Sequence, residues 1–341
     1  SKNIDDDCIT LNDPRYLSKD DFDTENKRTN IEPDDLLMTI VGTIGRVAIV
    51  PNAFTKICVQ RSVAVLKPKS DIVYNRFLMY HLQNMRPQLE RESRGVAQKG
   101  IYLKQIGNLT ISLPPLDKQR KIAAVLDKVS DLIAKRRQQL DKLDEMVKAR
   151  FVEMFGDPVV NPFGWNKSSL ESNATLLNGR AFKQDELLDS GKYPVLRVGN
   201  FFSNRGWYYS DLELDEDKYC DNGDLLYAWS ASFGSQIWNG GRVIYHYHIW
   251  KILQGDAYNK QFLCKLLEYV TESLMADTHG IAMMHLTKSG MEKTEFIVPP
   301  IDLQNQFAAF IEQTEKSKTT ISRSLEKLET LKKALMQKYF G

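Results

Sequence analysis

The sequence predicts an α+β protein with two globular mixed α/β domains in tandem repeat, separated by two long antiparallel coiled-coil helices. Three observations lead to this fold class. The chain has 341 residues, enough for two or three domains. It repeats itself at a nearly constant offset, and two long segments carry apolar residues at heptad spacing.

The composition is that of an ordinary globular chain, with 42% apolar and 26% charged residues. No run of about 18 apolar residues occurs, so we expect no membrane-spanning helix. The acidic start, Ser1 to Asp7, lacks the basic and apolar regions of a signal peptide. The four cysteines are widely spaced without a CxxC pair, which favours reduced thiols in a cytoplasmic protein.

The repeat is visible directly in the residues. Pro114-Pro115-Leu116-Asp117 returns as Pro299-Pro300-Ile301-Asp302, and the stretch 77–82 matches 262–267, both at an offset of 185. Upstream, Asp35-Leu36-Leu37 matches Asp224-Leu225-Leu226 at an offset of 189. The second copy begins near Asn161 and has about 35 to 40 residues before its match to Ser1. We therefore expect either that the first copy is shortened at its start or that its opening lies outside this sequence.

These matches predict four segments: a first domain over 1–115, a long helix over 116–156, a second domain over 157–300 and a C-terminal long helix over 301–341. The first helix lacks Gly and Pro from Lys118 to Phe155. Asp117 is predicted as its N-cap and Gly156 as its stop. Asp302 and Gly341 bracket the second helix in the same way.

The heptad positions alternate in steps of four and three residues. In the first helix they are Ile122, Leu126, Val129, Ile133, Arg136, Leu140, Leu143, Val147, Arg150 and Met154. In the second they are Phe307, Ile311, Thr314, Lys318, Ile321, Leu325, Leu328, Lys332, Leu335 and Tyr339. Polar members such as Arg136 and Lys318 suit a specific pairing of these two helices, because a buried charge needs a set partner or a route to water.

The globular parts carry matching β segments. In the first copy, 36–41 and 47–50 flank a glycine turn, and 59–66 follows as a strand. In the second copy the turn is 230–235 and the strand is 245–252. The apolar halves of the two later strands agree, whereas Gln60, Arg61 and Ser62 differ from His246, Tyr247 and His248. A shared scaffold with different polar loops fits two readers of different sequences; relaxed surface drift is the alternative.

Side chains suited to nucleic acid lie in these turns and loops, since Arg, Gln, Asn, Ser and His read base edges while Lys and Arg pair with phosphates. In the first copy the candidates are Thr43, Arg46, Lys56, Gln60, Arg61, Ser62, Arg94, Gln98 and Lys99, with Lys104 beside them. In the second copy they are Arg197, Asn200, Arg205, Trp229, Ser232, Ser235, His246, Tyr247, His248 and His285. The aromatic residues Trp207, Tyr208, Phe233 and Tyr245 either join this surface or belong to the core.

The charge is unevenly distributed although the net charge is only +2. Residues 1–40 carry 5 bases and 11 acids, and residues 41–116 carry 11 bases and 3 acids. Residues 157–300 carry 13 bases and 18 acids. The first domain therefore has a basic half, while the second must rely on something other than bulk attraction to phosphates.

Catalytic motifs do not occur in the sequence. There is no GxxxxGK[ST] loop, no nucleophile elbow and no HExxH pair. The motif Asn161-Pro162-Phe163-Gly164 is similar to the Asn-Pro-Pro-aromatic motif of adenine methyltransferases but lacks the second proline. His246 and His248 share a strand face, yet no neighbouring Cys or acid completes a metal site. We expect no enzyme activity, no metal and no bound cofactor.

Taken in order, the motifs resemble the specificity subunit of a type I restriction-modification system. The carriers are the opening Asn161 to Trp165, the stretch Tyr193 to Asn200, the turn Gly42 to Gly45, and the two Pro-Pro segments that lead into helices ending in Phe-Gly. The resemblance covers nearly the whole chain. The first copy departs from it because it lacks the Trp-containing opening and the Pro-Val-Leu-Arg-Val strand.

The resemblance implies a DNA-binding adaptor whose two target-recognition domains each read one half of a bipartite, asymmetric site in double-stranded DNA. The helices would act as a ruler and dock two modification subunits, which bind S-adenosylmethionine and methylate adenine. Restriction subunits would add cleavage driven by ATP and Mg. A helix of about 38 residues is roughly 57 Å long, against roughly 34 Å for one turn of DNA.

Two alternatives stay open at this point. The chain is either such a subunit or the recognition portion of a fused, type IIG-like restriction-methyltransferase, which an upstream methyltransferase domain in the gene would reveal. A coiled-coil assembly protein without a DNA role is the third reading, in which the helices merely dimerise or pack on the domains. Salt-dependent, sequence-selective binding to duplex DNA would exclude that reading.

Overall fold

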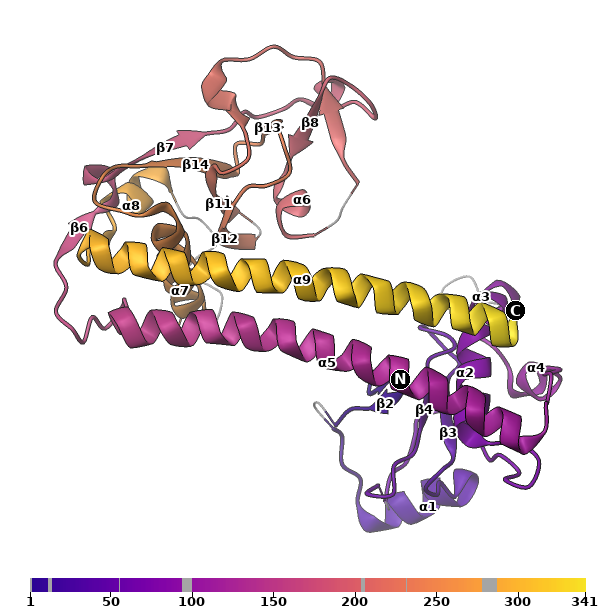
Figure 1. Ribbon diagram of the computed structural model, residues 1–341. Helices are drawn as coiled ribbons and strands as arrows, with labels where there is room; N and C mark the ends of the chain where they lie inside the picture. The colour runs from indigo at the N-terminus through magenta and orange to yellow at the C-terminus, as the bar shows by residue number, and fades with distance from the viewer. Residues whose placement is uncertain are drawn as a thin grey trace. The chain divides into compact units, whose positions relative to one another are not determined.

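The computed structural model describes residues 2–11, 14–54, 56–93, 100–203, 206–230, 232–277 and 287–341. The chain forms two compact units, the first made of residues 1–139 and 321–341 and the second of residues 140–320. Each unit contains part of α5 (Leu116–Phe155) and part of α9 (Ile301–Phe340), which Figure 1 draws in magenta and yellow. The compact units thus cut across the helices, and the four-segment division stays a prediction.

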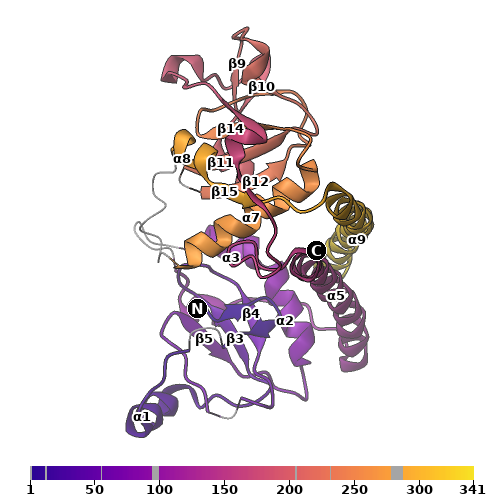
Figure 2. The ribbon, with the colours of Figure 1, turned by 90° about the vertical axis from the view of Figure 1, so that its left-hand side faces the viewer.

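The first unit is built around a small antiparallel sheet. Besides the long helices, its elements are β1 (Ile4–Asp5), β2 (Cys8–Ile9), α1 (Lys19–Thr29), β3 (Leu36–Thr39), β4 (Val47–Ile49), β5 (Val63–Leu66), α2 (Asn75–Asn84), α3 (Arg86–Glu92) and α4 (Leu103–Gly107). The strands run in the order β4-β3-β5, with Leu36 paired to Ile49 on one side and to Leu66 on the other. All four residues of β3 are buried, and α2 lies against β4 (Figure 2).

The second unit has two four-stranded sheets and a short ribbon. Its elements are β6 (Lys167–Ser169), β7 (Ala174–Asn178), β8 (Tyr193–Leu196), α6 (Val198–Phe202), β9 (Tyr208–Ser210), β10 (Tyr219–Cys220), β11 (Leu225–Ser230), β12 (Ser232–Ile237), β13 (Val243–Tyr245), β14 (Ile249–Gln254), α7 (Lys260–Asp277), α8 (Lys288–Lys293) and β15 (Glu295–Ile297). The sheets run β12-β11-β14-β7 and β10-β13-β8-β9, and β15 pairs with β6. In the second sheet, β13 and β8 are parallel.

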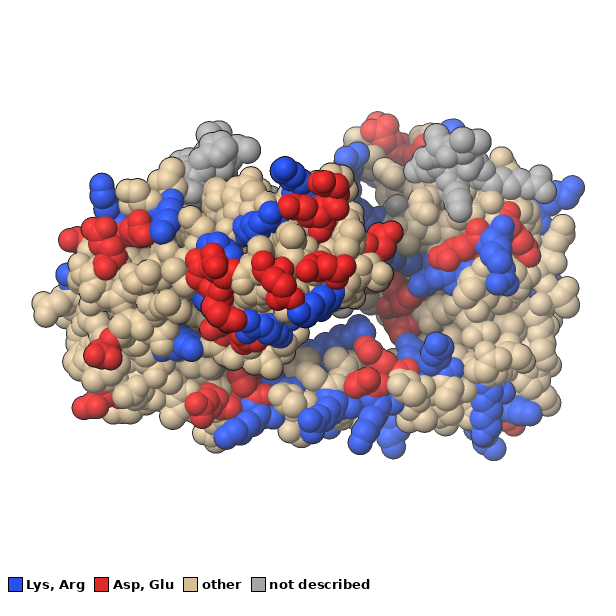
Figure 3. Space-filling view, turned by 90° about the horizontal axis from the view of Figure 1, so that it is seen from above, with Lys and Arg blue, Asp and Glu red and all other residues tan. Residues whose placement is uncertain are grey.

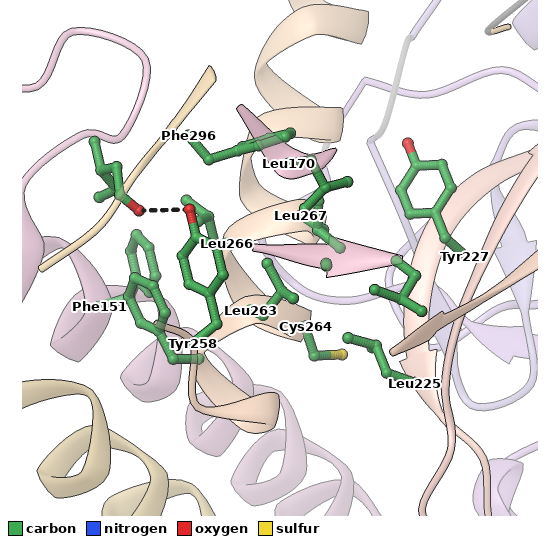
Figure 4. Packing of buried hydrophobic residues seen from close by; sticks show 14 of the residues in the cluster. Phe151, Leu170, Leu225, Tyr227, Tyr258, Leu263, Cys264, Leu266, Leu267 and Phe296 are labelled. Atoms are coloured by element: carbon green, nitrogen blue, oxygen red, sulfur yellow. Dashed lines mark hydrogen bonds between the residues drawn. The ribbon is translucent and has the colours of Figure 1, made fainter. Parts of the chain in front are cut away.

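An aromatic cluster fixes the second unit to its part of the long helices. The Phe151 and Phe155 rings of α5 lie 5.6 and 5.5 Å from the Phe307 ring of α9. Phe155 also meets Phe262 of α7 edge-on at 4.7 Å. Figure 4 shows Phe151 among the α7 leucines and Tyr258, whose hydroxyl donates to the Ile297 carbonyl (3.3 Å). Such aromatic contacts add to the stabilisation from buried area.

The two long helices pack antiparallel in each unit along the predicted seam. In the first unit Ile122 and Leu126 are buried against Leu335 and Tyr339. In the second, Val147 is buried in one cluster with Phe307 and Ile311. Because rising numbers on one helix meet falling numbers on the other, the helices run in opposite directions.

Two of the polar seam residues, Arg136 and Lys318, have partners on the opposite helix. Arg136 donates to the Ser324 hydroxyl at 3.2 Å. Lys318 pairs with Asp144 at 2.8 Å. This matches the expectation that a charge within the seam needs a set partner, and each such pair favours one alignment of the helices over its shifted alternatives.

A buried glutamine joins each globular part to the start of its long helix. The Gln119 side-chain oxygen accepts from the Tyr74 backbone N–H (2.8 Å), and its amide donates to the carbonyls of Ile72 (3.0 Å) and Pro114 (2.8 Å). The same three bonds recur in the second unit. There Gln304 bonds Asn259 N (2.9 Å), Ala257 O (2.9 Å) and Pro299 O (2.8 Å). We call each set a glutamine clamp.

Several predicted boundaries are wrong. With Asp117 and Asp302 as N-caps the long helices would begin at Lys118 and Leu303. They begin two residues earlier, at Leu116 and Ile301, so both aspartates lie inside the first turn and are not N-caps. The Pro115 carbonyl instead accepts from Lys118 N (2.8 Å). The Gly156 stop is confirmed, because this residue has a φ of +73° and donates to the Val152 carbonyl (2.8 Å).

The strands predicted over 59–66 and 245–252 are also too long. The strand predicted over 59–66 begins at Val63, because 60–62 form a turn closed by Val63 N donating to the Gln60 carbonyl (2.9 Å). The strand predicted over 245–252 is split into β13 and β14 by an equivalent turn over 246–248.

None of the helices in the described parts of the chain is long and apolar enough to cross a membrane.

Replacing Gln304 with Leu tests the glutamine clamp. The change leaves two carbonyls and one N–H without a partner beside a side chain that is 0% exposed. Since each unsatisfied buried group costs about 1–3 kcal/mol, the free energy of unfolding should fall by at least about 2 kcal/mol in denaturant titration. Gln306→Leu, on the exposed face of the same turn, is the control, with an expected change within about 0.5 kcal/mol. Equal losses in both variants would contradict the clamp.

Candidate nucleic-acid interface

The turn over 246–248 is the centre of the candidate surface in the second unit. His246 N donates to the Leu196 carbonyl (2.9 Å), and Ile249 N closes the turn on the His246 carbonyl (2.9 Å). The rings of His246 and His248 lie 4.7 Å apart, and Tyr247 is exposed between them. Burial lowers the pKa of His246 to about 4, helped by the nearby His248 and Arg197. At neutral pH the turn therefore presents neutral imidazoles, which donate and accept hydrogen bonds.

Trp229, at the end of β11, holds this turn in place. Its indole N–H donates to the Tyr247 carbonyl (2.9 Å), and its backbone N–H donates to the His248 carbonyl (3.0 Å). The indole also stacks on Trp250 at 5.5 Å. Trp229 was predicted to contact nucleic acid, but its indole N–H is already bonded to the Tyr247 carbonyl. Its role in this geometry is to position the turn.

Arg180 and Phe182 approach the same turn from the end of β7. Arg180 N donates to the Tyr245 carbonyl (2.9 Å), and Tyr247 N donates to the Arg180 carbonyl (3.0 Å). The Phe182 ring stacks on His246 at 6.3 Å. At Gly179 an added Cβ would lie 2.3 Å from the Tyr245 carbonyl oxygen, so this close approach requires glycine. Neither Arg180 nor Phe182 was predicted as a site residue, because no motif in the sequence singles them out.

Arg197 lies at the start of α6, close enough to His246 to lower the pKa of that imidazole. Its guanidinium carbon is 4.3 Å from the centre of the Tyr208 ring. Its buried Nε has no hydrogen-bond partner among the described residues. Asn200, one turn further along α6, donates to the Gly206 carbonyl (3.3 Å). A guanidinium held on a ring face is a group that binds phosphates and base edges.

The first unit repeats the turn with other side chains. Ile40 N donates to the Ser62 carbonyl (2.9 Å), as Trp229 N does to His248, and Val63 N closes on Gln60. Gln60 and Arg61 are exposed, while the buried Ser62 hydroxyl has no partner among the described residues. The two turns thus share a backbone arrangement and present different polar groups.

The glycine turn over 42–45 flanks this site. Gly42 and Gly45 have φ values of +79° and +81°, Thr43 is exposed and Ile44 is buried. The Arg86 side chain donates two hydrogen bonds to the Gly45 carbonyl (3.1 and 3.0 Å). No motif in the sequence singles out Arg86. Since Arg46 lies 3.9 Å from the Asp5 carboxylate, its charge is partly neutralised by the N-terminal ribbon.

The remaining predicted residues fall in three groups. Arg94, Gln98, Lys99, Arg205 and His285 lie outside the described residues. Lys56, Lys104 and Ser232 are exposed. Ser235 and Tyr245 point elsewhere: the Ser235 hydroxyl donates to the Cys264 carbonyl (2.6 Å), and Tyr245 is fully buried with its hydroxyl on the Asp217 carbonyl (2.6 Å). Among the described residues, no group of three or more His, Cys, Asp or Glu is placed to hold a metal ion.

Acidic partners neutralise many of the exposed cations of the second unit. Arg242 pairs with Glu216 (2.7 Å) and Asp221 (2.8 Å), and Lys192 pairs with Glu213. Figure 3 shows basic and acidic side chains interleaved on the face it draws. Bulk attraction to phosphates is therefore weak here, in line with the excess of acids in this part of the sequence.

The chain matches the family described as the type I restriction modification DNA specificity domain, over residues 7–144 and again over 162–332. The EcoBI type I restriction enzyme specificity subunit of Escherichia coli is 35% identical over 121 residues, which are 35% of this chain and 25% of that protein. The MjaVIII specificity subunit of Methanocaldococcus jannaschii is 22% identical over 346 residues, which are 91% of this chain and 79% of that protein. A second protein of that organism is 30% identical over 35% of this chain and 27% of its own length. The chain thus spans about a quarter of two of these relatives.

Solved structures share the fold. A chain from work on complex assembly and conformational transition of the type I R-M system gives a TM-score of 0.56 at 17% identity, covering 91% of this chain and 82% of that one. The type I S subunit from M. genitalium gives 0.53 at 14% identity, covering 92% and 85%. The predicted fold class, with two tandem recognition domains and long helices, is confirmed.

The depressed pKa of His246 predicts a pH-dependent stability. Between pH 6.5 and 4 the unfolded chain binds a proton at this side chain and the folded chain does not. Stability should therefore fall as pH drops through this window. Thermal unfolding at pH 7.5 and pH 5.0 should show a smaller loss in His246→Gln than in the parent chain. An identical loss in both would show that His246 is protonated in the fold.

Proposed function

The chain belongs to the type I restriction-modification DNA specificity family, and from that premise we propose that it reads a bipartite, asymmetric site in double-stranded DNA. Each recognition domain reads one half of the site. The observation that carries the proposal is the pair of equivalent turns, 60–62 and 246–248. Their backbones are held by matching hydrogen bonds, and their side chains differ. Different donors and acceptors on one scaffold are what two distinct half-sites require.

The two domains attract DNA by different means. In the first, Arg61 and Lys56 are exposed, so charge and hydrogen bonding act together. In the second, neutral His246 and His248, the exposed Tyr247 and Arg197 offer specific contacts with little bulk attraction. Thr43, Gln60, Ser62, Asn200 and Ser232 complete the proposed contact set. Trp229 positions the second turn.

The chain acts as an adaptor in the cytoplasm and carries no catalytic group of its own. The long helices, each of 40 residues and roughly 60 Å, set the distance between the half-sites and dock two modification subunits. S-adenosylmethionine is bound by those subunits, and ATP and Mg by the restriction subunits that join them. The paired polar residues of the seam support a fixed helix alignment, which a ruler needs.

Reconstitution tests the adaptor function. The purified chain alone should transfer no methyl group from labelled S-adenosylmethionine to DNA. Addition of the modification subunit from the same host should give adenine methylation at a split site, read by methylation-sensitive sequencing. Methyl transfer by the chain alone would sink the proposal, and so would methylation by the complex at an undivided site.

Arg61→Ala tests the assignment of the first turn. Loss of a base contact should reduce discrimination at one half-site by about 10- to 100-fold while leaving preference at the other half-site intact. Competition binding with half-site variants measures both. Lys69→Ala, an exposed lysine beyond the other end of β5, is the matched control and should leave discrimination unchanged. An equal loss of affinity for all sequences would instead make Arg61 a phosphate contact.

A further inference from the structure

The loop that follows β7 carries an arginine whose main chain is part of the 246–248 turn. Arg180 and His246 form a parallel β-bridge, in which Arg180 N donates to the Tyr245 carbonyl (2.9 Å). The Arg180 carbonyl in turn accepts from Tyr247 N (3.0 Å). Because these bonds involve main-chain atoms, they do not depend on the side chain at this position. The Arg180 side chain therefore has a role of its own to be identified.

An ion pair fixes the direction of the Arg180 guanidinium. Its Nη1 and Nη2 donate to the two oxygens of the Glu186 carboxylate (2.8 and 2.7 Å). That carboxylate also accepts from Lys183 N (2.8 Å), so the main chain of the loop holds it in place. The Arg180 side chain is nevertheless 30% exposed. Since a guanidinium has five N–H donors in one plane, the pair with Glu186 leaves donors that point elsewhere.

Aromatic rings connect this guanidinium to the turn. The guanidinium carbon of Arg180 lies 5.2 Å from the centre of the Phe182 ring, and that ring stacks on His246 at 6.3 Å. The His246 ring lies 4.7 Å from His248. This row places a fixed cation beside the neutral imidazoles of the turn, where the proposed base contacts of the second domain lie.

We propose that Arg180 reads a guanine in the half-site of the second domain and that Glu186 is the residue that positions it. The inference rests on the proposed function and names one base of the site. In the major groove a guanine presents N7 and O6 as adjacent acceptors, which a planar guanidinium matches with two N–H groups. A guanidinium that is already held on a carboxylate loses less conformational freedom when it makes such a contact.

Arg242 is a similar arginine in a different place. It is bonded to the Glu216 carboxylate (2.7 Å), and its guanidinium carbon lies 4.3 Å from the centre of the Tyr219 ring. Arg242 comes directly before β13, however, whereas the 246–248 turn comes directly after that strand. It therefore shares the ion pair and the ring contact of Arg180 but lies at the far end of the strand, which makes it a matched control.

Arg180→Gln tests the base contact in the complex reconstituted with the modification subunit. Glutamine loses the charge and the paired donors that suit guanine, and its amide suits adenine. In competition binding we expect the preference for guanine at one position of one half-site to fall about 10- to 100-fold, while the other half-site keeps its preference. Arg242→Gln should leave every position unchanged. An unaltered preference in the Arg180 variant, or an equal loss of affinity for all sequences, would overturn the inference.

Glu186→Gln tests the positioning role. The change removes a negative charge and one strong acceptor, so Arg180 becomes able to reach phosphates. We expect binding to unrelated duplex DNA to become tighter and to weaken more steeply with salt, while the guanine preference falls. An unchanged guanine preference would overturn the role of Glu186. A parent complex that methylates no split site would instead overturn the proposed function, and this inference with it.

Discussion

The glutamine clamp is the interaction on which the rest of the molecule depends. A globular domain and a long helix are joined through two prolines, and prolines supply no N–H to hold that joint. Gln119 bonds the loop before α2 and Gln304 the loop before α7, and each also bonds a Pro carbonyl, within a dry environment where such bonds are strong. In the first unit Arg76 and Tyr80 add a second tie from α2 to Asp127 of α5. The orientation of each helix relative to its domain follows from these few bonds.

Held in this way, the domains place their turns by backbone rather than by side-chain chemistry. Main-chain N–H groups of Ile40, just after β3, and of Trp229, in β11, donate to the 60–62 and 246–248 turns. The exposed side chains of the turns can therefore vary without disturbing the sheet. The surroundings vary too. Arg86 and the acidic ribbon contact the glycine turn over 42–45 in the first unit, whereas Trp229, Phe182 and Arg180 brace the 246–248 turn in the second. Under the proposed function, specificity and stability therefore reside on different atoms, which lets one scaffold read two half-sites.

The repeated segments and the helices with periodic apolar residues can be located from the sequence. The offset of 185 located both clamped helices, and heptad spacing identified the buried faces of Leu126 and Phe307. Prediction from the sequence failed where tertiary contacts decide. Nothing local in Tyr245–Ile252 indicates that the strand breaks at His246, because the break depends on Leu196 and Arg180 from distant segments. Arg86 and Phe182 were missed for the same reason: their partners lie far away in the chain.

The make-up of the two units has a consequence for biosynthesis. Each unit combines the beginning of one long helix with the end of the other, so the first unit needs residues 321–341 as well as residues 1–139. A ribosome delivers residues 140–320 before that last stretch, and domains generally fold as units when their residues are available. The second unit is therefore free to fold first, while the N-terminal half waits with Leu126 and its neighbours uncovered. Of the two units, the one whose residues are made first completes its fold second, and it needs protection from aggregation until residues 321–341 have been made.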